Sequence, residues 1–505
     1  MQLKMWSYDL AREQCPTLDH LYEIASLSQE SGYNALGLYL EHRFEYPSTP
    51  WAHGVGALSA EHVASLQSEF PSLQIIPMIN TLSHMEGFLF TEPGRDLAAQ
   101  TFQGMMGDPL NPAFIDLCER LVEDTLLCFD SEILHLGGDE ASELRTAPIL
   151  ADLAQEPGGV ERLFREHFGP LAMMVLKSGR RPALWADMIL ANPGAADELP
   201  KETLLFDWQY FGGVAESSAR LREMGFEVVA CPSIQTYNAA WMHLGPSQEN
   251  IAQVVADADR LGLHGVCLTT WECGLMGAYD TLFPAIQGVG QLLNDRSVGE
   301  ACLEQAYRDR SPDHSRWSEL MGNELQQHPG FEYSTHRSSL KCRFLLYSNP
   351  FWLWVHHRED WVGPSGEAIL KLLDEAALVA PGLAEQGVTH FVRSAIDFVR
   401  IVDKSVEKYR QKLPSEAITA MAPLRGLFDD LSKIARQNHH RIGGSLADLE
   451  RIKIAKAHVE RVIARIREVG AGQLGYLPSF EHLSHPSFVP HDQGAWWRIN
   501  SWGTR

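Results

Sequence analysis

Short apolar runs alternate with longer amphipathic runs along roughly the first 295 residues of the chain. The apolar runs have the length of buried strands, and the amphipathic runs repeat their apolar positions every three or four residues, as helices do. The pattern predicts strands at residues 3–10, 35–41, 74–82, 132–137, 181–188, 203–210, 226–233 and 265–272. It predicts helices between them, among others at residues 17–32, 111–129, 213–225 and 250–262.

Near-continuous apolar strands that alternate with helices are typical of a parallel sheet covered on both faces. Eight strand–helix units over this length favour an α/β fold, namely a (β/α)8 or TIM barrel. The alternative is a doubly wound open sheet, which is expected to have fewer strands and, for a dinucleotide, a G-x-G-x-x-G motif after the first strand. The first strand is followed by no such motif, and we therefore expect a barrel.

Beyond about residue 330 the strand-like runs largely stop, and amphipathic helical patterns follow. They predict helices at residues 365–380, 384–411, 415–438 and 445–468. We expect a catalytic barrel at 1–330 and a mainly α-helical C-terminal domain at 331–505, whose tail contains Trp496, Trp497 and Trp502. The helical domain either packs beside the barrel as a purely structural element or, with its aromatic tail, closes the active site of a neighbouring subunit in a homodimer.

Composition and charge restrict the classes of partner. Of the 505 residues 45% are hydrophobic and 21% are charged, as in an ordinary globular protein. The formal net charge of −23 disfavours nucleic acid and anionic membranes as partners. No apolar run approaches a membrane span, and the first ten residues lack the pattern of a signal peptide. The eight cysteines are scattered without a C-x-x-C pair, which indicates free thiols in a reducing cytoplasm.

The positions at the C-terminal ends of the predicted strands carry the candidate chemistry, because these ends converge on one mouth of a barrel. They hold acids, rings and histidines: Glu41, His42, Arg43, Asn80, His84, Asp139, Glu140, Trp185, Asp187, Asp207, Trp208, Tyr210, Tyr237, Asn238, Trp271 and Glu272. Acidic acceptors beside apolar ring faces indicate a neutral, polyhydroxylated ligand.

Each of these residues alone also has a structural explanation. Asp139 could cap the helix that follows, the tryptophans could be packing at the barrel edge, and His84 or His42 could satisfy a buried carbonyl. Glu272 could be a solvated loop acid. Packing explains the joint pattern, with acids and rings on separate strand ends, much less well.

The stretch EILHLGGDEAS, residues 132–142, ends a predicted strand in two glycines and two adjacent acids. An ordinary retaining glycosidase needs two carboxyls about 5–5.5 Å apart that flank the bond. Neighbouring side chains tend to diverge, so we expect adjacent acids to fit that geometry poorly.

Separate catalytic tasks for Asp139 and Glu140 fit the adjacent positions better. Glu140, its pKa raised by burial and by the neighbouring charge, would protonate the leaving oxygen. Asp139 would accept a hydrogen bond from the N–H of a 2-acetamido group on the substrate, whose own oxygen is then the nucleophile.

These motifs resemble glycoside hydrolase family 20, the β-N-acetylhexosaminidases. The strand-4 signature of that family, H-x-G-G-D-E, matches residues 135–140 at every fixed position. INTLSH at 79–84 resembles its strand-3 I-D-x-P-G-H, with Asn80 in place of the acid. The resemblance implies a (β/α)8 barrel and retaining, substrate-assisted removal of terminal β-linked GlcNAc or GalNAc from oligosaccharides through an oxazolinium intermediate. It implies no metal and no organic cofactor.

The resemblance also implies roles for residues at matching positions. Trp185, Trp208 and Trp271 would enclose the acetamido methyl group, Tyr237 would donate to the acetamido oxygen, and Glu272 would bind sugar hydroxyls. The predicted catalytic residues are Asp139, Glu140 and Tyr237. The predicted substrate-binding residues are Glu41, His84, Trp185, Asp187, Trp208, Tyr210, Asn238, Trp271 and Glu272.

The sequence departs from the family at the end of the pocket that would hold the sugar hydroxyls. Lys4 falls near the strand-1 arginine of the family, and Glu41 or Arg43 are the candidates to replace that arginine. Ala239 stands where the family has an acid two residues after its strand-7 tyrosine. The preference between GlcNAc and GalNAc is therefore open. The first predicted strand begins almost at Met1, so the pattern resembles a shorter bacterial branch without an N-terminal α/β domain.

Two alternative functions stay open at this point. One is a conventional two-carboxylate retaining β-glycosidase, which would pair Glu140 with Glu272 or Asp187 and form a covalent ester with the sugar. The other is a catalytically silent sugar-binding barrel, which would bind GlcNAc and release no product.

Overall fold

A computed structural model describes most of the chain. The described residues are 1–11, 16–54, 56–236, 240–271, 276, 279–332, 340–347, 349–442 and 445–475. The chain divides into two compact units. The first consists of residues 1–234, 246–271 and 285–303. The second consists of residues 235–245, 272–284 and 304–505. The domain boundary at residue 330 stays a prediction.

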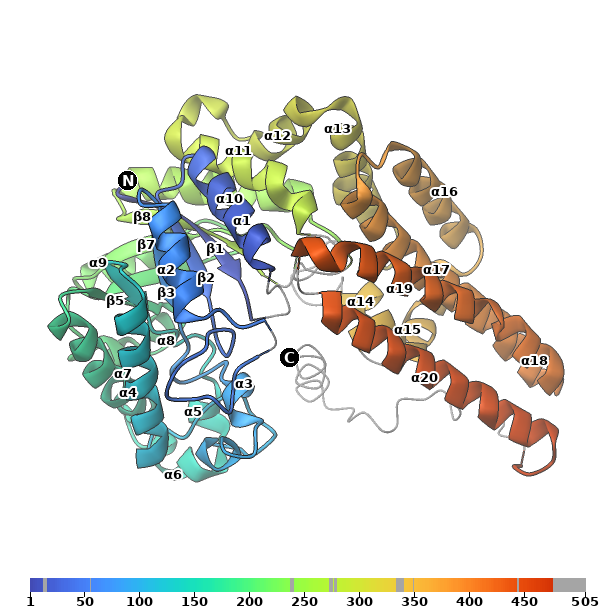
Figure 1. The fold of residues 1–505 in the computed structure, drawn as a ribbon, viewed down its shortest axis with the longest axis horizontal. Coiled ribbons are helices and arrows are strands. Elements are labelled where there is room, and N and C mark those ends of the chain that lie inside the picture. The colour runs from blue at the N-terminus through green and yellow to red at the C-terminus, as the bar shows by residue number, and fades with distance from the viewer. Residues whose placement is uncertain are drawn as a thin grey trace. The chain divides into compact units, whose positions relative to one another are not determined.

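The first unit is built on a closed barrel of eight parallel strands (Figure 1). The strands are β1 (Leu3–Asp9), β2 (Ala35–Tyr39), β3 (Gln74–Met78), β4 (Ile133–His135), β5 (Arg181–Trp185), β6 (Leu204–Trp208), β7 (Glu227–Cys231) and β8 (Gly265–Thr270). Each strand pairs with the next in chain order, and β8 pairs with β1 in the register Leu3 opposite Gly265. The predicted (β/α)8 barrel is therefore confirmed, and all eight predicted strands are present.

The barrel interior is filled with apolar side chains. Met5, Met78, Phe206 and Cys267 belong to one buried cluster, and Trp185 belongs to it from the end of β5. Where β8 meets β1, a Cβ atom on Gly265 would lie 2.3 Å from the carbonyl oxygen of Leu3. Only glycine therefore allows the two strands to approach closely enough to close the barrel.

Helices connect and cover the strands of the first unit. They are α1 (Leu18–Glu30), α2 (Ala60–Glu69), α3 (Glu86–Leu89), α4 (Pro112–Cys128), α5 (Glu143–Thr146), α6 (Ala151–Gln155), α7 (Gly159–Lys177), α8 (Asp187–Ala191), α9 (Ala215–Glu223), α10 (Leu244–Leu261) and α11 (Phe283–Asn294). Local sequence sets their starts: Asn111 accepts from the backbone N–H of Ala113 at the start of α4, and Pro112 occupies the first turn.

Some predicted strands extend past their real ends. The predicted strand at 74–82 ends at Met78, and the one at 181–188 ends at Trp185. The apolar pattern continues after β3 because Ile79 and Leu82 are also buried, although the chain has already left the sheet. Burial alone therefore does not mark the strand end, and the residues beyond it are those that form the mouth of the barrel.

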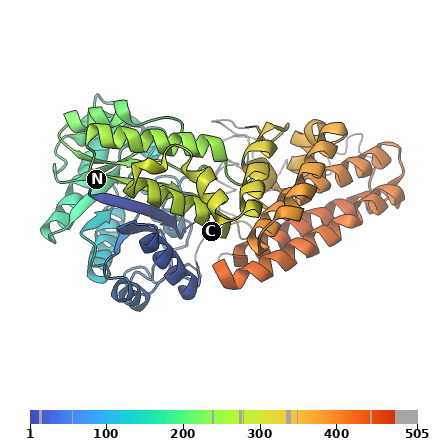
Figure 2. The same cartoon turned by 90° about the horizontal axis from the view of Figure 1, so that it is seen from above.

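The second unit is helical, as predicted for the C-terminal region. Its helices are α12 (Cys302–Arg310), α13 (Pro312–Glu319), α14 (Leu340–Tyr347), α15 (Phe351–Trp361), α16 (Pro364–Val379), α17 (Leu383–Arg410), α18 (Pro414–Met421), α19 (Pro423–Ile442) and α20 (Ser445–Gly470). Helices α17, α19 and α20 lie side by side in both views (Figures 1 and 2). The prediction of a single helix at 415–438 is wrong, because two helices, α18 and α19, cover this range. Pro423 starts a second helix there, because proline has no N–H to continue the first one.

The loops that follow β7 and β8 belong to the helical unit. Trp241 in the first loop donates through Nε1 to Oγ1 of Thr281 in the second, at 2.7 Å. The centroid of its indole ring lies 4.6 Å from that of Trp317 in α13. The aromatic tail with Trp496, Trp497 and Trp502 lies outside the described residues, so the dimer hypothesis stays a prediction.

Two further sequence expectations concern thiols and membranes. The six cysteines in the described part of the chain are free: Cys118, Cys128, Cys231, Cys267, Cys302 and Cys342. No described helix combines the length and the apolar character that crossing a membrane would require.

Candidate active site

Two glycines turn the chain out of β4 and bring two acids to the barrel mouth. Gly137 and Gly138 have φ angles of +82° and +93°, a conformation that costs other residues energy. A Cβ atom on Gly137 would also lie 2.7 Å from Oδ1 of Asn80. Asp139 does not occupy the cap position of the next helix, because α5 begins at Glu143 with Ser142 before it.

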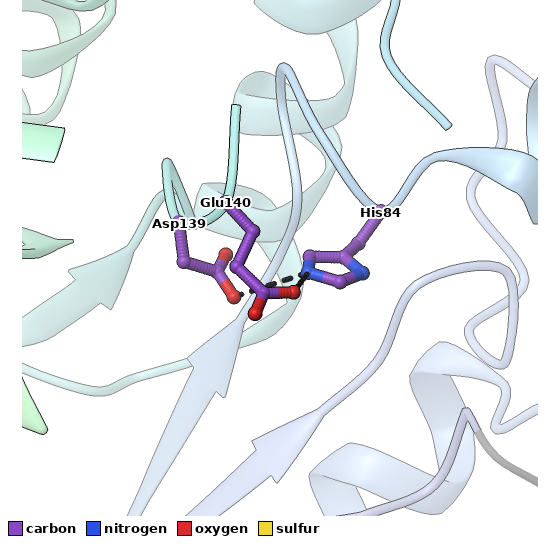
Figure 3. Close-up of side chains that lie close together, drawn as sticks. All are labelled: His84, Asp139 and Glu140. Carbon is purple, nitrogen blue, oxygen red and sulfur yellow. Dashed lines mark ion pairs between the residues drawn. The ribbon is translucent and has the colours of Figure 1, made fainter. Parts of the chain in front are cut away.

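One imidazole contacts both acids (Figure 3). Nε2 of His84 lies 3.2 Å from Oδ2 of Asp139 and 3.3 Å from Oε2 of Glu140. The three contacting atoms lie within 4.8 Å of one another. The adjacent acids therefore do not diverge as the sequence led us to expect. The left-handed backbone of Glu140, with φ +49°, is not that of a strand, so the alternation of side chains on which that expectation rested does not apply.

The two carboxylates determine the charge of His84. Burial opposes the charged imidazolium, but the attraction of Asp139 and then of Glu140 outweighs burial, so the pKa of His84 lies well above its ordinary value. The side chain of His84 is 5% exposed, that of Asp139 18% and that of Glu140 50%. Glu140 is thus half-exposed, contrary to the burial we expected.

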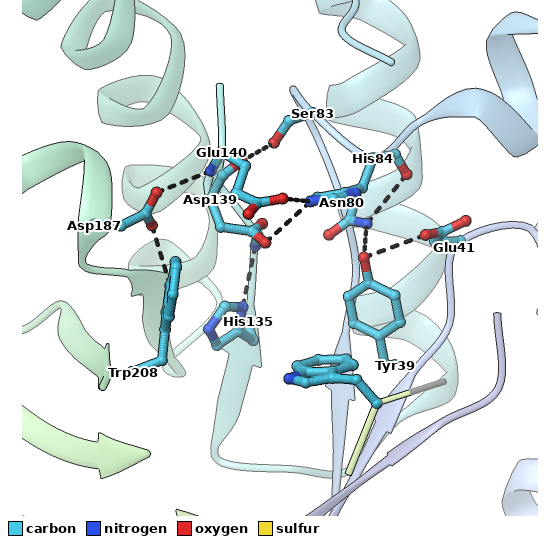
Figure 4. Close-up of polar contacts among 12 residues, drawn as sticks. Tyr39, Glu41, Asn80, Ser83, His84, His135, Asp139, Glu140, Asp187 and Trp208 are labelled. Carbon is cyan, nitrogen blue, oxygen red and sulfur yellow. Dashed lines mark hydrogen bonds and ion pairs between the residues drawn. The ribbon is translucent and has the colours of Figure 1, made fainter. Parts of the chain in front are cut away.

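A hydrogen-bonded chain holds the loop that carries His84 (Figure 4). Nδ2 of Asn80 donates to the Tyr39 hydroxyl at 2.6 Å and to the backbone oxygen of His84 at 3.2 Å. The Tyr39 hydroxyl in turn donates to Oε1 of Glu41 at 3.2 Å. On the other side, the Ser83 hydroxyl donates to the backbone oxygen of Asp139. These contacts join the ends of β2, β3 and β4.

Three of these residues have left-handed backbones although none is glycine. Their φ angles are +39° at Glu41, +52° at His84 and +49° at Glu140. Each such conformation costs on the order of 1–3 kcal/mol, and it persists only where the surrounding contacts enforce it. Strain of this kind at three neighbouring strand ends is typical of a functional site.

Aromatic side chains form a continuous wall beside the acids. Ring centroids are 6.0 Å apart for Trp185 and Trp271, and 5.1 Å apart for Trp208 and Tyr210. Nε1 of Trp271 donates to the Tyr210 hydroxyl at 2.8 Å and connects the two pairs. Trp185 is almost fully buried, whereas Trp208 and Trp271 are partly buried against the core. The structure therefore brings together all three tryptophans predicted to surround a ligand.

His135, the first residue of the strand-4 signature, packs against Trp185 of this wall. The backbone N–H of Gly137 donates to its Nδ1 at 3.1 Å, and its ring centroid is 4.6 Å from that of Trp185. Burial lowers the pKa of His135 to about 3, so the ring is neutral at ordinary pH. Its role is therefore to pack and to shape the turn.

Asp187 follows β5 and contacts both an acid, Glu140, and a residue of the aromatic wall, Trp208. Its Oδ2 accepts from the backbone N–H of Glu140 at 2.9 Å, and its Oδ1 accepts from Nε1 of Trp208 at 3.4 Å (Figure 4). Burial and the charge of Asp139 raise the pKa of Asp187 to about 7. Both oxygens of the Asp187 carboxyl therefore accept hydrogen bonds from the protein itself.

Other predicted residues lie elsewhere or outside the described part. Tyr237, Asn238 and Glu272 lie outside the described residues. Nζ of Lys4 donates to Oδ1 of Asn294, the last residue of α11, at 2.5 Å. Lys4 is the second residue of β1, so its ammonium group is at the end of the barrel opposite the mouth. Glu41 and Arg43, the candidates to replace the missing arginine, are both buried at the end of β2.

Tyr39 and Ser83 were missed as site residues, and Asn80 was a candidate at its strand end to which no role was assigned. Tyr39 carried a signal, because it stands two residues before Glu41 at a strand end, where alternate residues share a face. Ser83 carried none, because its partner is a backbone oxygen of a distant segment.

The cluster of His84, Asp139 and Glu140 offers three ligand atoms close enough together to hold a metal ion. A proton on His84 satisfies the same two carboxylates, which is the arrangement that its raised pKa describes.

Comparison with known proteins gives a family for part of the chain. Residues 73–260 match the family model described as glycosyl hydrolase family 20, catalytic domain. This part of the chain belongs to glycosyl hydrolase family 20. The family-20 region contains β3 to β7 and with them His84, Asp139, Glu140, Trp185 and Trp208.

Two curated relatives and one solved structure are similar to parts of this chain. The chain is 28% identical over 198 residues to beta-hexosaminidase A of Caenorhabditis elegans. The matching region covers 34% of this chain and 35% of that protein. The figures are the same for beta-hexosaminidase A of Caenorhabditis briggsae. The chain thus spans about a third of the length of these curated relatives. The chitobiase of Flavobacterium johnsoniae has a similar fold, with a TM-score of 0.50, 13% identity and coverage of 89% of this chain and 78% of that one.

The charge on His84 predicts a particular pH dependence of stability. Because the folded-state pKa lies above its ordinary value of 6.5, protonated His84 stabilises the fold fully below pH 6.5, and this contribution is lost as the pH rises through the folded pKa. The difference in unfolding free energy between wild type and His84→Gln should therefore be largest below pH 6.5 and shrink above it, measured by chemical denaturation.

His264→Gln is the matched control for that experiment. Burial lowers the pKa of His264 despite its contact with Glu227, so its free-energy difference should shift in favour of the variant as the pH falls below 6.5. A difference for His84→Gln that grows with pH would contradict the charged imidazolium.

Proposed function

We propose that this protein is a retaining exo-β-N-acetylhexosaminidase that removes terminal β-linked N-acetylhexosamine from oligosaccharides or glycoconjugates. The observation that carries the proposal is the pair of adjacent acids, Asp139 and Glu140, held by one imidazole beside a wall of three tryptophans. The acids differ in exposure and can therefore take different tasks.

Glu140 is proposed as the general acid. Its half-exposed carboxyl extends from the turn into the mouth, where the leaving oxygen of a bound glycoside would lie. It would protonate that oxygen as the glycosidic bond breaks and then, as the base, remove a proton from the water that completes hydrolysis. His84, which contacts Oε2 of Glu140, would hold this carboxyl in place between the two steps.

Asp139 is proposed to act on the substrate amide. Its carboxylate, less exposed than that of Glu140, would accept a hydrogen bond from the acetamido N–H and point the amide oxygen at the anomeric carbon. Attack by that oxygen gives a positively charged oxazolinium ring, which the nearby carboxylate stabilises. Trp185, Trp208 and Trp271 would enclose the acetamido methyl group, an apolar group that suits aromatic faces.

The geometry argues against a conventional pair of catalytic carboxylates. Such a pair lies about 5–5.5 Å apart with the sugar between the two groups. Oδ2 of Asp139 and Oε2 of Glu140 instead both contact Nε2 of His84, at 3.2 and 3.3 Å, so at least one of these contacts would have to break before a pyranose ring could lie between the two carboxyls. Asp187 is a poor nucleophile because both its oxygens already accept N–H donors.

The names of similar proteins support the same class of reaction. The two curated relatives are beta-hexosaminidases, and the structure with the similar fold is a chitobiase. We propose that both GlcNAc and GalNAc are accepted. The arginine expected on strand 1 is absent from the mouth, since Lys4 lies at the other end of β1, and the sugar hydroxyls would be held less selectively.

Substrate-assisted catalysis predicts a strict need for the acetamido group. Aryl β-GlcNAc and aryl β-GalNAc should be hydrolysed, whereas the aryl β-glucoside with the same leaving group should react at least about a thousandfold more slowly, because an intramolecular nucleophile provides an advantage of that order or more. Steady-state rates on the three substrates measure this. Equal rates would favour the conventional two-carboxylate glycosidase, and binding of GlcNAc without turnover of any substrate would favour the silent sugar-binding barrel.

Substitutions of the two acids should have different signatures. Glu140→Gln removes only acid assistance, so kcat should fall by about 10²–10⁴-fold on a poor leaving group and far less on a dinitrophenyl glycoside. Asp139→Asn weakens control of the nucleophile, so kcat should fall by about 10²–10³-fold whatever the leaving group. Measuring both variants on a series of aryl glycosides tests this assignment. The opposite pattern would exchange the two roles.

A further inference from the structure

Asp187 lies where the acid and the aromatic wall of the site meet. It begins α8 directly after β5, and its two carboxyl oxygens have different partners. Oδ2 accepts from the backbone N–H of Glu140 after β4, and Oδ1 accepts from the indole N–H of Trp208 at the end of β6. One side chain thus connects three strand ends of the barrel (Figure 4).

We propose that Asp187 is a positioning residue, which as a carboxylate holds the backbone of Glu140 and the indole of Trp208 in a fixed relation and does not itself bind sugar. Its kinetic consequence rests on the proposed function, because that function makes Glu140 the acid and Trp208 part of the acetamido wall. The contacts themselves do not depend on that function.

The chemistry of the two contacts calls for a carboxylate. Both partners are N–H donors, and a carboxylate accepts at both oxygens without offering a hydrogen of its own. Asparagine would satisfy only one partner, because its NH2 group would face the other N–H. The contact with Glu140 is the shorter, 2.9 Å against 3.4 Å, so the amide oxygen should remain with Glu140 and the NH2 group should face Trp208.

The backbone of Glu140 needs such support. Its left-handed φ of +49° is unfavourable for a glutamate, and its side chain, half-exposed and in contact with His84, does not itself fix that backbone conformation. The bond from its N–H to Asp187 therefore acts at the point where the acid leaves the turn. Small displacements of a catalytic group are costly, about a hundredfold in rate for 1 Å.

The titration of Asp187 agrees with a role inside the protein. Burial and the charge of Asp139 raise its pKa to about 7, and the hydrogen bonds from Glu140 and Trp208 act in the opposite direction. The charged groups that act on it are Asp139 and Glu140. Without its two N–H donors, the carboxylate would be still harder to keep ionised near neutral pH.

The test is a double-mutant cycle with Asp187→Asn and Trp208→Phe. Phenylalanine keeps an aromatic face and removes the N–H, so each single variant should lower kcat/KM on aryl β-GlcNAc by about tenfold, the effect of losing one hydrogen bond to a charged group. The double variant should be no worse than the poorer single variant, because both remove the same contact. Multiplied effects, about a hundredfold, would overturn the proposal.

A second readout does not depend on activity. In protein labelled with 15N at the indole nitrogens, the Trp208 signal is the one missing from the spectrum of Trp208→Phe. It should move upfield in Asp187→Asn, because its acceptor is lost. An unchanged signal would overturn the proposal. If wild-type protein hydrolyses no aryl N-acetylhexosaminide, the proposed function fails, and this spectrum alone decides the role of Asp187.

Asp257→Asn provides the matched control. Oδ2 of Asp257 also accepts backbone N–H groups, those of Val214 and Ala215 at the start of α9, both at 3.1 Å. Its substitution should lower stability without changing kcat/KM or the Trp208 signal.

The variant Asp187→Ala loses both contacts, so its rate should depend more strongly on the leaving group than that of Asp187→Asn. Equal dependence would mean that Asp187 does not position the acid.

Discussion

Two neighbouring carboxylates at one strand end need a positive charge between them. Two like charges 4 Å apart repel by about 4 kcal/mol at the dielectric typical of a protein surface, and burial adds to that cost. The imidazole of His84 provides the charge, with one nitrogen in contact with both Asp139 and Glu140. This three-group contact is the constraint on which the rest of the site depends, because without it the turn after β4 would expel one acid or protonate it.

Much of the surrounding structure serves this contact. Tyr39 and Asn80 hold the loop of His84, and the two glycines after β4 turn the acids toward that loop. The left-handed backbones of Glu41, His84 and Glu140 are unfavourable by themselves, so the hydrogen bonds around them must offset the strain. The closed barrel makes this feasible, since it fixes the ends of β2, β3 and β4 side by side on a rigid, well-packed core.

The sequence was sufficient for the barrel and for most of the site. Buried parallel strands have a strong apolar pattern, and the residues that follow them converge on one mouth of the barrel. The sequence alone therefore placed Asp139, Glu140, His84 and the three tryptophans at that mouth. The two-helix structure around Pro423 was missed because its amphipathic pattern continues across the break.

Other features depend on three-dimensional contacts that no periodicity reports. Whether adjacent acids diverge is decided by a left-handed φ at Glu140, and whether Asp187 faces a sugar or the protein is decided by an N–H from another strand. Ser83 acts on a backbone oxygen, which any sequence would offer. Exposure of Glu140 likewise follows from the direction of the turn and not from its neighbours in the chain.

The central claim is that the sugar supplies the nucleophile while Asp139 steers its amide and Glu140 transfers the proton. A crystal structure with the thiazoline derived from N-acetylglucosamine, a stable mimic of the bicyclic intermediate, tests it most directly. The account predicts that the ring nitrogen lies within hydrogen-bonding distance of Asp139, that the methyl group lies against Trp185, Trp208 and Trp271, and that Glu140 faces the anomeric carbon. A ring nitrogen remote from Asp139, or a covalent ester between sugar and protein when a glycoside is soaked instead, would contradict it.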